Sequence, residues 1–569
     1  ISFNTGLGHR STGPRSSSPT GIGNSEAKNA GLFFAEGGDR LCQHLAGESV
    51  HLRAQTGWRD IAAAAIKSPG QLDSLPGDFG FIAFGDGLDE GSQECVAVVR
   101  SCGGLAPFHL YEYEGVVAIS TRVADLIQYL PQAPEPDPLV WATFASGVTE
   151  FPDGRGFLRH SRIVPRGHVA LVSIDPRASR TACGAVYRPA RMVKYFDPRP
   201  ASWPVPSGER RAEHVARLKG IILGALEADL DREGMNVLSL SGGVDSSVLG
   251  ALAAGELDFP VASISQIPPP SSKFHNLESG YIKRLGQAAG IDRQVLVGQD
   301  LGGWLASMSV APSAGFPCGN PFVAAIGDLA GEIPFSVAFG GEHADEVCGS
   351  FVTIPDWAMA TRIGELARSL GRLPSGPKDL VRWFAWRAMW ALGRPRLYMR
   401  PHLPPVVVKQ IRDEYDEWFN RMVKSGSGPG PWRFLSTWHR HDGWTGNLWE
   451  ILTGMGIRRS MPFMTREALE LVYDCHPSEL VGPGPKKLLR QAFSGMVPQD
   501  NLMRADKGSP LIPSLEGTHR WVTAMPGVVE PIIGSPRGQA DLDFGFPDIM
   551  TLTLLERAGR SFEELRRAT

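Results

Sequence analysis

One stretch of the sequence, MNVLSLSGGVDSSVLGALAAG from Met235 to Gly255, restricts the possible folds more than any other. An apolar run, a short Ser/Gly loop and apolar residues at helical spacing predict a buried strand, a tight turn and a helix. Strand-like and helix-like segments alternate around it, which predicts a parallel sheet covered on both faces. Because ligands bind such sheets beyond the carboxyl ends of the strands, the loop is a candidate binding site.

The neighbouring segments continue this alternation. Short apolar runs predict further strands and helical spacing predicts helices, the strands at 259–267, 293–298 and 334–341 and the helices at 210–231 and 281–291. Residues 356–451 have a mainly helical pattern and many tryptophans. Residues 201–569 are therefore predicted to form an α/β domain with a helical region.

Residues 31–186 have a different pattern, in which short apolar runs alternate with closely spaced turns. This pattern predicts a mostly antiparallel β domain. The first thirty residues, rich in Gly, Ser and Pro, are expected to be a flexible arm, and the Pro-rich segment Arg188–Glu209 is the predicted linker. Since 569 residues are too many for one hydrophobic core, we predict two domains, 1–200 and 201–569.

Composition excludes several classes of protein. The formal net charge of -3 lacks the basic excess of a nucleic-acid-binding protein. We find no long apolar run and no basic leader, which predicts a cytoplasmic chain without a membrane partner. The seven cysteines form no CxxC pair, and their odd number argues against a disulfide framework and against a zinc site.

The chemistry of the loop points to a phosphate ligand. Gly242 and Gly243 allow the backbone to approach an oxyanion, and the hydroxyls of Ser241 and Ser246 are suitable donors. Asp245 would repel a phosphate unless a cation lay between them, so its presence predicts Mg²⁺. The loop lacks the GxxxxGK[ST] pattern of a P-loop. The alternative is a plain strand-to-helix turn with a serine as the helix cap.

Four segments in order carry a resemblance to a known family. SGGVDSS resembles the pyrophosphate loop of the ATP pyrophosphatases, which cleave ATP between the α and β phosphates. FGGEHADEVCGS (339–350), GIRRSMPFMTREALELVYDCHP (456–477) and KKLLRQAFSGMVPQDNLMRADKGSP (486–510) resemble motifs of its asparagine-synthetase-like branch. The resemblance spans residues 236–510 and implies an enzyme that uses ATP and Mg²⁺ to form an amide and releases AMP and pyrophosphate.

The resemblance also implies a role for individual residues. It places the nucleotide and its phosphates at Ser241, Gly242, Gly243, Asp245, Ser246, Gly340, Gly341 and Lys486. It implies that Asp245 and Asp345 are the magnesium ligands. Glu342 would orient the incoming amine and accept its proton, and Lys507 would neutralise the phosphates and the developing oxyanion. As alternatives, Glu342 and Asp345 are ordinary acids of a first helical turn, and Lys507 is a solvated lysine.

The first domain resembles the later part of a glutaminase of the Ntn type. Glutaminases of this type use a cysteine at the mature N-terminus, whereas this sequence starts with Ile1 and shows no glutamine-binding segment. The internal Cys42, Cys95 and Cys102 lack the terminal amine that serves as base. We therefore expect a degenerate domain that acts as a scaffold, unless trimming removed a terminal cysteine.

An amide synthetase without an ammonia source needs an amine already present on its substrate. This points to closure of a ring within one substrate, as in the β-lactam-forming synthetases and the lasso peptide macrolactam synthetases of the family. The segment FGGEHADE resembles the acidic Gly-rich turn of the lasso enzymes more closely, because the β-lactam enzymes have a tyrosine where this sequence has Glu342. The resemblance therefore favours a lasso peptide macrolactam synthetase, which joins the N-terminal amine of a core peptide to an Asp or Glu side chain. The expected partners are that precursor peptide and, beyond it, a leader peptidase and a leader-binding protein. The tryptophans of the helical region are candidates for a peptide groove or for core packing. An asparagine synthetase, a β-lactam-forming synthetase and an inactive scaffold remain as alternatives.

Overall fold

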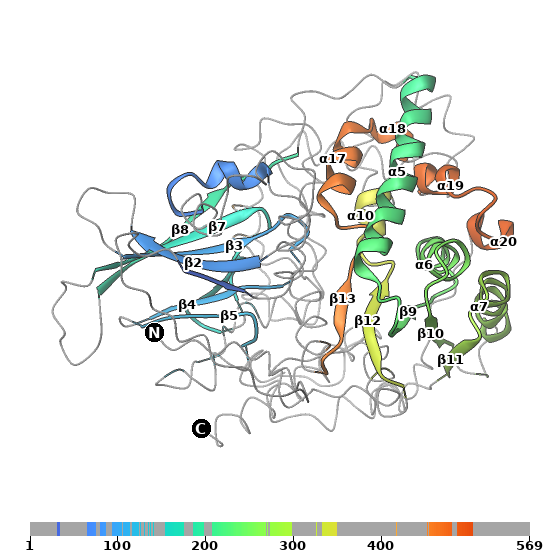
Figure 1. The fold of residues 1–569 in the computed structure, drawn as a ribbon, viewed down its shortest axis with the longest axis horizontal. Coiled ribbons are helices and arrows are strands. Elements are labelled where there is room, and N and C mark those ends of the chain that lie inside the picture. Colours follow the sequence, from blue (N-terminus) through green and yellow to red (C-terminus); the bar gives the residue numbers. More distant parts are fainter. Residues whose placement is uncertain are drawn as a thin grey trace. The chain divides into compact units, whose positions relative to one another are not determined.

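The computed structural model describes residues 31–34, 65–74, 80–86, most of 94–198, most of 207–298, 333–349, 455–480, 486–504 and a few isolated positions. The chain divides into two compact units (Figure 1). Unit 1 contains residues 1–134 and 158–197, and unit 2 contains residues 135–157 and 198–569. The predicted N-terminal arm, the tryptophans of the helical region and Lys507 lie outside the described residues.

Unit 1 contains two antiparallel sheets. The larger has the order β1-β2-β3-β7-β8, with β1 Gly31–Phe34, β2 Gly80–Asp86, β3 Glu94–Arg100, β7 His168–Asp175 and β8 Val186–Lys194. The smaller has the order β5-β4-β6, with β4 His109–Tyr113, β5 Val116–Ser120 and β6 Ser161–Ile163. The predicted β-rich N-terminal region is thereby confirmed.

Alternation along β3 explains how this sheet is buried on both faces. Val96 and Val98 pack with Phe108 and Leu110 in one cluster of buried residues. The intervening side chains, among them Val99, belong to a second cluster with residues of the 3₁₀ helix η1 (Pro69–Ser74). Because successive side chains of a strand point to opposite faces, one apolar run supplies both clusters.

The start of the predicted linker is instead a strand, so that prediction is wrong for residues 188–194. β8 pairs with β7, and their register shifts at the position of Pro189. A proline without an N–H is tolerated because β8 is an edge strand with a bulge there. The neighbouring Ala190 N–H donates to the Glu112 carboxylate of β4 at 2.7 Å, which satisfies a donor that the bulge removes from the ladder.

Unit 2 contains a five-stranded sheet in the order β11-β10-β9-β12-β13, in which every pair is parallel. Its strands are β9 Met235–Ser239, β10 Val261–Ile267, β11 Arg293–Gly298, β12 Phe335–Gly340 and β13 Arg458–Ser460. Four of these strands are at the predicted positions, and β13 was not predicted. The chain moves outward from β9 through β10 to β11 and then returns to the other side of β9. The carboxyl ends of β9 and β12 therefore meet at the switch point of the sheet.

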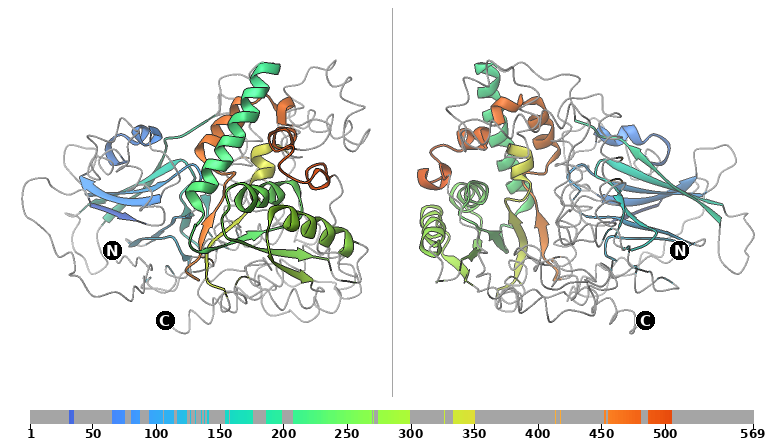
Figure 2. Two further views of the ribbon diagram at one scale, coloured as in Figure 1. Left: turned by 45° about the vertical axis from the view of Figure 1, so that its right-hand side comes forward. Right: turned by 180° about the vertical axis from the view of Figure 1, so that it is seen from behind.

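The helices of unit 2 lie around this sheet (Figure 2). They are α5 Gly208–Asp229, α6 Val244–Gly250 with its π-helical continuation η3 (Ala251–Glu256), α7 His275–Ala289, α10 Ala344–Cys348, α17 Arg466–Asp474, α18 Pro477–Leu480, α19 Lys487–Ala492 and α20 Gln499–Leu502. Helix α5 packs against α17 and α19, and α20 packs against α6 and α7. Ser207 caps α5 and Thr465 caps α17, each by accepting a backbone N–H of the first turn.

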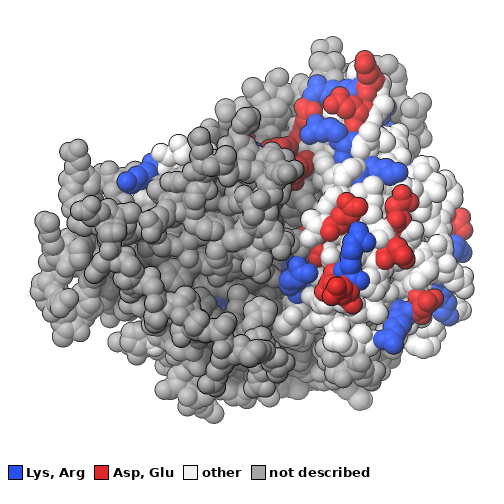
Figure 3. All heavy atoms as spheres, viewed as in Figure 1, with Lys and Arg blue, Asp and Glu red and all other residues white. Residues whose placement is uncertain are grey.

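The surface of unit 2 is mixed in charge. On the face shown in Figure 3, Lys and Arg side chains lie among Asp and Glu side chains over the described residues. Helix α5 has 22 residues, yet charged side chains recur along it. Within the described ranges, no helix is long and apolar enough to cross a membrane.

Candidate functional site

The site begins with the β9–α6 loop (residues 240–243), which connects the central strand of unit 2 to α6. Gly242 has a φ of +64°, and a Cβ there would lie 3.1 Å from Cβ of Tyr281. Both facts require glycine, because an L side chain would be strained in this conformation and would press on α7. The backbone therefore makes this sharp turn most easily with glycine at position 242.

Two serine hydroxyls close the loop across its width. The Ser246 hydroxyl accepts the backbone N–H of Ser241 at 3.1 Å and lies 3.1 Å from the Ser241 hydroxyl. The N-cap of α6 is Gly243, which offers no side-chain cap to the first-turn N–H groups. The alternative in which a serine caps this helix is therefore wrong. Uncapped N–H groups beside two hydroxyls and two glycines suit an oxyanion such as a phosphate.

Arg504 holds the backbone of the β9–α6 loop. The sequence did not predict this role. Its Nη1 donates to the Gly242 carbonyl at 3.2 Å, and its Nη2 forms a buried ion pair with Glu278 of α7. The guanidinium also lies over the Tyr281 ring, 4.3 Å from the centroid. Arg504 is 7% exposed, so these contacts fix the loop rather than reach into solvent.

The β12–α10 turn (residues 341–343) lies directly against the β9–α6 loop. A Cβ at Gly341 would come within 2.6 Å of Cβ of Asp245, so the two turns are in backbone contact. His343 adopts φ +64°, which places Asp345 and Glu346 in the first turn of α10. The carboxylate of Glu342 folds against Gly340 and is partly buried. The first turn of α6, which carries Asp245, thus meets the acidic β12–α10 turn at the switch point of the sheet.

Lys486 joins these two turns. Its ammonium forms ion pairs with Asp245 and, at 2.9 Å, with Asp345 Oδ1. The backbone of Lys486 has φ +61°, and its N–H donates to the Gly349 carbonyl at 2.6 Å, just after α10. Burial alone lowers the pKa of Lys486, but the charges of Asp245 and Asp345 outweigh it and hold the pKa above its ordinary value. The lysine therefore stays protonated and holds the two carboxylates together.

The same pair of carboxylates fits a magnesium ion. Mg²⁺ prefers carboxylate oxygens, and Asp245 and Asp345 already converge on one shared positive charge, the ammonium of Lys486. Asp345 is 48% exposed, so a cation can reach its carboxylate from solvent. The residues present thus fit the divalent cation that the sequence predicts.

Cys348 lies close to these carboxylates but has no part in the chemistry. It is fully buried, and burial and then the charge of Asp245 raise the pKa of its thiol. The thiol is therefore neutral and unreactive.

The structure brings the predicted residues of the described part together. The two turns at the carboxyl ends of β9 and β12 carry all but one of them, namely Ser241, Gly242, Gly243, Asp245, Ser246, Gly340, Gly341, Glu342 and Asp345, and Lys486 joins them from the start of α19. Their roles remain predictions, and Lys507 lies outside the described residues.

A parallel sheet with a Ser-Gly-Gly loop at its switch point, next to an acidic turn, defines an ATP-using enzyme of the ATP pyrophosphatase fold. The sequence profile of the asparagine synthase family matches residues 225–536, which is more than half of the chain. The chain therefore belongs to the asparagine synthase family, and it is an ATP-dependent carbon–nitrogen ligase that forms an amide. A comparison with curated protein sequences gave no match.

Proposed function

We propose that this enzyme is a macrolactam synthetase that closes the ring of a lasso peptide. It activates an Asp or Glu side chain of a core peptide with ATP and joins it to the N-terminal amine of the same peptide. The observation that supports this most is the position of Glu342, in the turn whose Gly341 contacts Asp245. A carboxylate next to the phosphate site is placed to receive the proton of an attacking amine.

The reaction follows from the parts of the site. The substrate carboxylate attacks the α-phosphorus, the bond to the β-phosphate oxygen breaks, and pyrophosphate leaves. The loop hydroxyls and N–H groups bind its oxygens, and Mg²⁺ on Asp245 and Asp345 would neutralise its charge.

In the second step the amine attacks the acyl carbon and AMP leaves. The nitrogen must lose a proton, which Glu342 accepts. Lys507 is the proposed partner of the oxyanion, as its resemblance to the family lysine implies.

Unit 1 is proposed to be a degenerate glutaminase-like domain that supplies no ammonia. Cys95 lies on β3 and is buried, and burial raises the pKa of its thiol to about 11. Cys102 is also buried. These two thiols of the described part are therefore poor nucleophiles, which supports a scaffold role.

The proposed partners are a precursor peptide and, upstream in the pathway, a leader peptidase with a leader-binding protein. A peptide substrate carries both reacting groups, so ring closure needs no separate nitrogen source. The proposed location is the cytoplasm, where ATP is available.

One experiment separates this proposal from the alternatives. The purified enzyme is incubated with ATP, Mg²⁺ and either a synthetic core peptide, aspartate with ammonia, or a β-amino acid precursor of a β-lactam. We expect AMP, pyrophosphate and a peptide lighter by one water only in the first case. Asparagine or a β-lactam would replace the proposal with that activity, and no AMP with any substrate would contradict amide synthesis altogether.

A further inference from the structure

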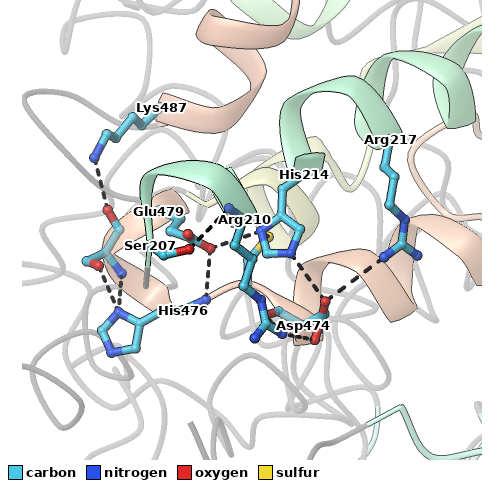
Figure 4. A network of polar contacts seen from close by, with 10 residues as sticks. Ser207, Arg210, His214, Arg217, Asp474, His476, Glu479 and Lys487 are labelled. Atoms are coloured by element: carbon cyan, nitrogen blue, oxygen red, sulfur yellow. Dashed lines mark hydrogen bonds and ion pairs between the residues drawn. The ribbon is translucent and has the colours of Figure 1, made fainter. Parts of the chain in front are cut away.

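A second group of reactive side chains lies in unit 2, on helices rather than strand ends. His214 of α5, Cys475 at the end of α17 and Glu479 of α18 meet in the interior. His214 and Glu479 are labelled in Figure 4. We call these three residues the His214 cluster. Their exposed fractions are 1%, 0% and 0%, and their potential ligand atoms all lie within 4.8 Å of one another.

The contacts within this cluster centre on one ring nitrogen. His214 Nδ1 lies 3.0 Å from Glu479 Oε2 and 3.3 Å from Cys475 Sγ. A ring nitrogen carries one hydrogen or one lone pair, so it cannot make a linear bond to both atoms. Within the described part of the chain, the second carboxylate oxygen, Glu479 Oε1, has no hydrogen-bond partner although it is fully buried. An orphaned carboxylate oxygen in a protein interior is costly.

A cation at the centre of the cluster resolves both problems. Around tetrahedral Zn²⁺, nitrogen and oxygen ligands lie about 3.3 Å apart, and nitrogen and sulfur ligands lie about 3.6 Å apart, as bond lengths of about 2.0–2.3 Å require. The corresponding separations are 3.0 and 3.3 Å, so each opens by only a few tenths of an ångström. Imidazole, thiolate and carboxylate are also the three ligand types that zinc takes in proteins.

The surroundings orient the ligands as those of a metal site do. The other ring nitrogen of His214, Nε2, lies 3.2 Å from Asp474, which itself pairs with Arg210 and Arg217 (Figure 4). A carboxylate at this nitrogen fixes the tautomer that leaves Nδ1 free to bind metal. The backbone N–H of His476 donates to Glu479 Oε2 at 3.2 Å and holds that carboxylate in place.

We propose that His214, Cys475 and Glu479 bind a divalent cation of the zinc class. The charges balance, because one thiolate and one carboxylate neutralise the two positive charges. The ion would join α5, which precedes the sheet, to the α17–α18 segment. That segment lies against the active site, since Leu480 packs on Gly349, whose carbonyl holds the backbone of Lys486. Three side chains fill three of the four positions of tetrahedral zinc, and the ion would stabilise the packing of these helices rather than take part in the reaction.

The test is metal binding by the full-length chain. The protein is stripped with a chelator, exchanged with Zn²⁺ or Co²⁺, and assayed for metal content and for the cobalt–thiolate absorption band. We expect about one ion per chain. Cys475→Ser and Glu479→Gln should each weaken binding at least tenfold, and Asp474→Asn should weaken it about tenfold by freeing the His214 ring.

The matched control is Cys95→Ser, which removes a buried cysteine of unit 1 and should leave metal binding unchanged. Circular dichroism establishes which variants are folded. If Cys475→Ser or Glu479→Gln fails to fold, Asp474→Asn still tests the proposal, because Asp474 is 43% exposed. Chelation should lower the midpoint of thermal unfolding of the wild type but not that of Glu479→Gln. If the wild type binds no zinc, or if Cys475→Ser and Asp474→Asn bind it as tightly as the wild type does, the proposal is wrong.

Discussion

The carboxylates of the candidate site and the His214 cluster belong to the same unit but differ in their exposure to solvent. Asp345 is 48% exposed and shares the Lys486 ammonium with Asp245, so a ligand can enter and compete for these charges. His214 and Glu479 have side chains only 1% exposed and face each other in the interior. Carboxylates at the open end of a sheet therefore suit the exchange of substrate and Mg²⁺. Carboxylates enclosed by helices suit an ion that stays bound.

The largest effects are expected when one carboxylate is removed from the candidate site or from the His214 cluster. Asp245→Ala should lower the rate of AMP and pyrophosphate release about 10³-fold, because it removes charge compensation made at the reacting phosphates. Zinc content should stay at the wild-type level. Glu479→Gln should do the reverse, losing zinc while keeping turnover within about threefold below its unfolding temperature.

Asp292→Ala is the control for Asp245→Ala. Asp292 is an exposed carboxylate just before the amino end of the outer strand β11, whereas the candidate site lies at the carboxyl ends of β9 and β12. It should leave both readouts unchanged. Loss of zinc in Asp245→Ala would show that the two groups are not independent. Full turnover in this variant would show that Asp245 is not part of the site.

A second test removes the shared cation of the open site. Lys486→Met leaves Asp245 and Asp345 uncompensated, and in metal-free buffer it should lower the free energy of unfolding by about 3 kcal/mol. Addition of Mg²⁺ should restore part of this loss. Urea denaturation with and without Mg²⁺ measures both effects.

The pH dependence of this stabilisation follows from the raised pKa of Lys486. A base whose pKa is raised on folding stabilises the fold fully below its unfolded value and loses the effect only as the pH rises through the folded value. The Lys486 contribution should therefore be constant between pH 6 and pH 9, within about 0.5 kcal/mol. Lys487→Met is the matched control, because that neighbouring ammonium donates to the Ser478 carbonyl at 3.2 Å instead. Equal losses in both variants would rule out a special role for Lys486.

The smallest effect is expected from the contact between the two turns. Gly341→Ala places a Cβ 2.6 Å from Cβ of Asp245, so the β12–α10 turn must shift away from the loop. Turnover should fall about tenfold, with little change in stability, because reacting groups tolerate small displacements poorly. Gly224→Ala on α5, where a Cβ meets no atom within 4 Å, should leave turnover unchanged and stabilise the helix slightly. Unchanged kinetics in Gly341→Ala would mean that this contact does not position the site.

Local patterns predicted much of the fold correctly. The apolar runs that form β9, β10, β11 and β12 were recognised because a buried parallel strand needs a continuous apolar run. β8 was missed because Pro189 reads as a linker, and only its place at a sheet edge makes the proline acceptable. β13 was missed because Arg458–Ser460 is short and polar, and it becomes a strand by pairing with β12.

The parts of the candidate site that consist of consecutive residues were predictable, and the contacts between distant residues were not. The Ser-Gly-Gly loop and the acidic turn each occupy a few consecutive residues, and their meeting follows from the rule that parallel strands end at one edge. The contact of Lys486 with Asp245 and Asp345 was not predictable, because nothing in the sequence next to Lys486 shows two carboxylates beside it. Arg504 was missed because its partners, Gly242 and Glu278, lie more than two hundred positions away.

The sequence by itself determined the parallel sheet, the loop at the end of β9 and the family, since each depends on short-range pattern. It also argued against a zinc site, because no cysteine pair is present. Only the tertiary structure brought His214 to Cys475, 261 positions away, and Lys486 to Asp245, 241 positions away. The physical reason is that a buried charge is acceptable only next to its partner, and helix packing rather than sequence spacing decides which charges become neighbours.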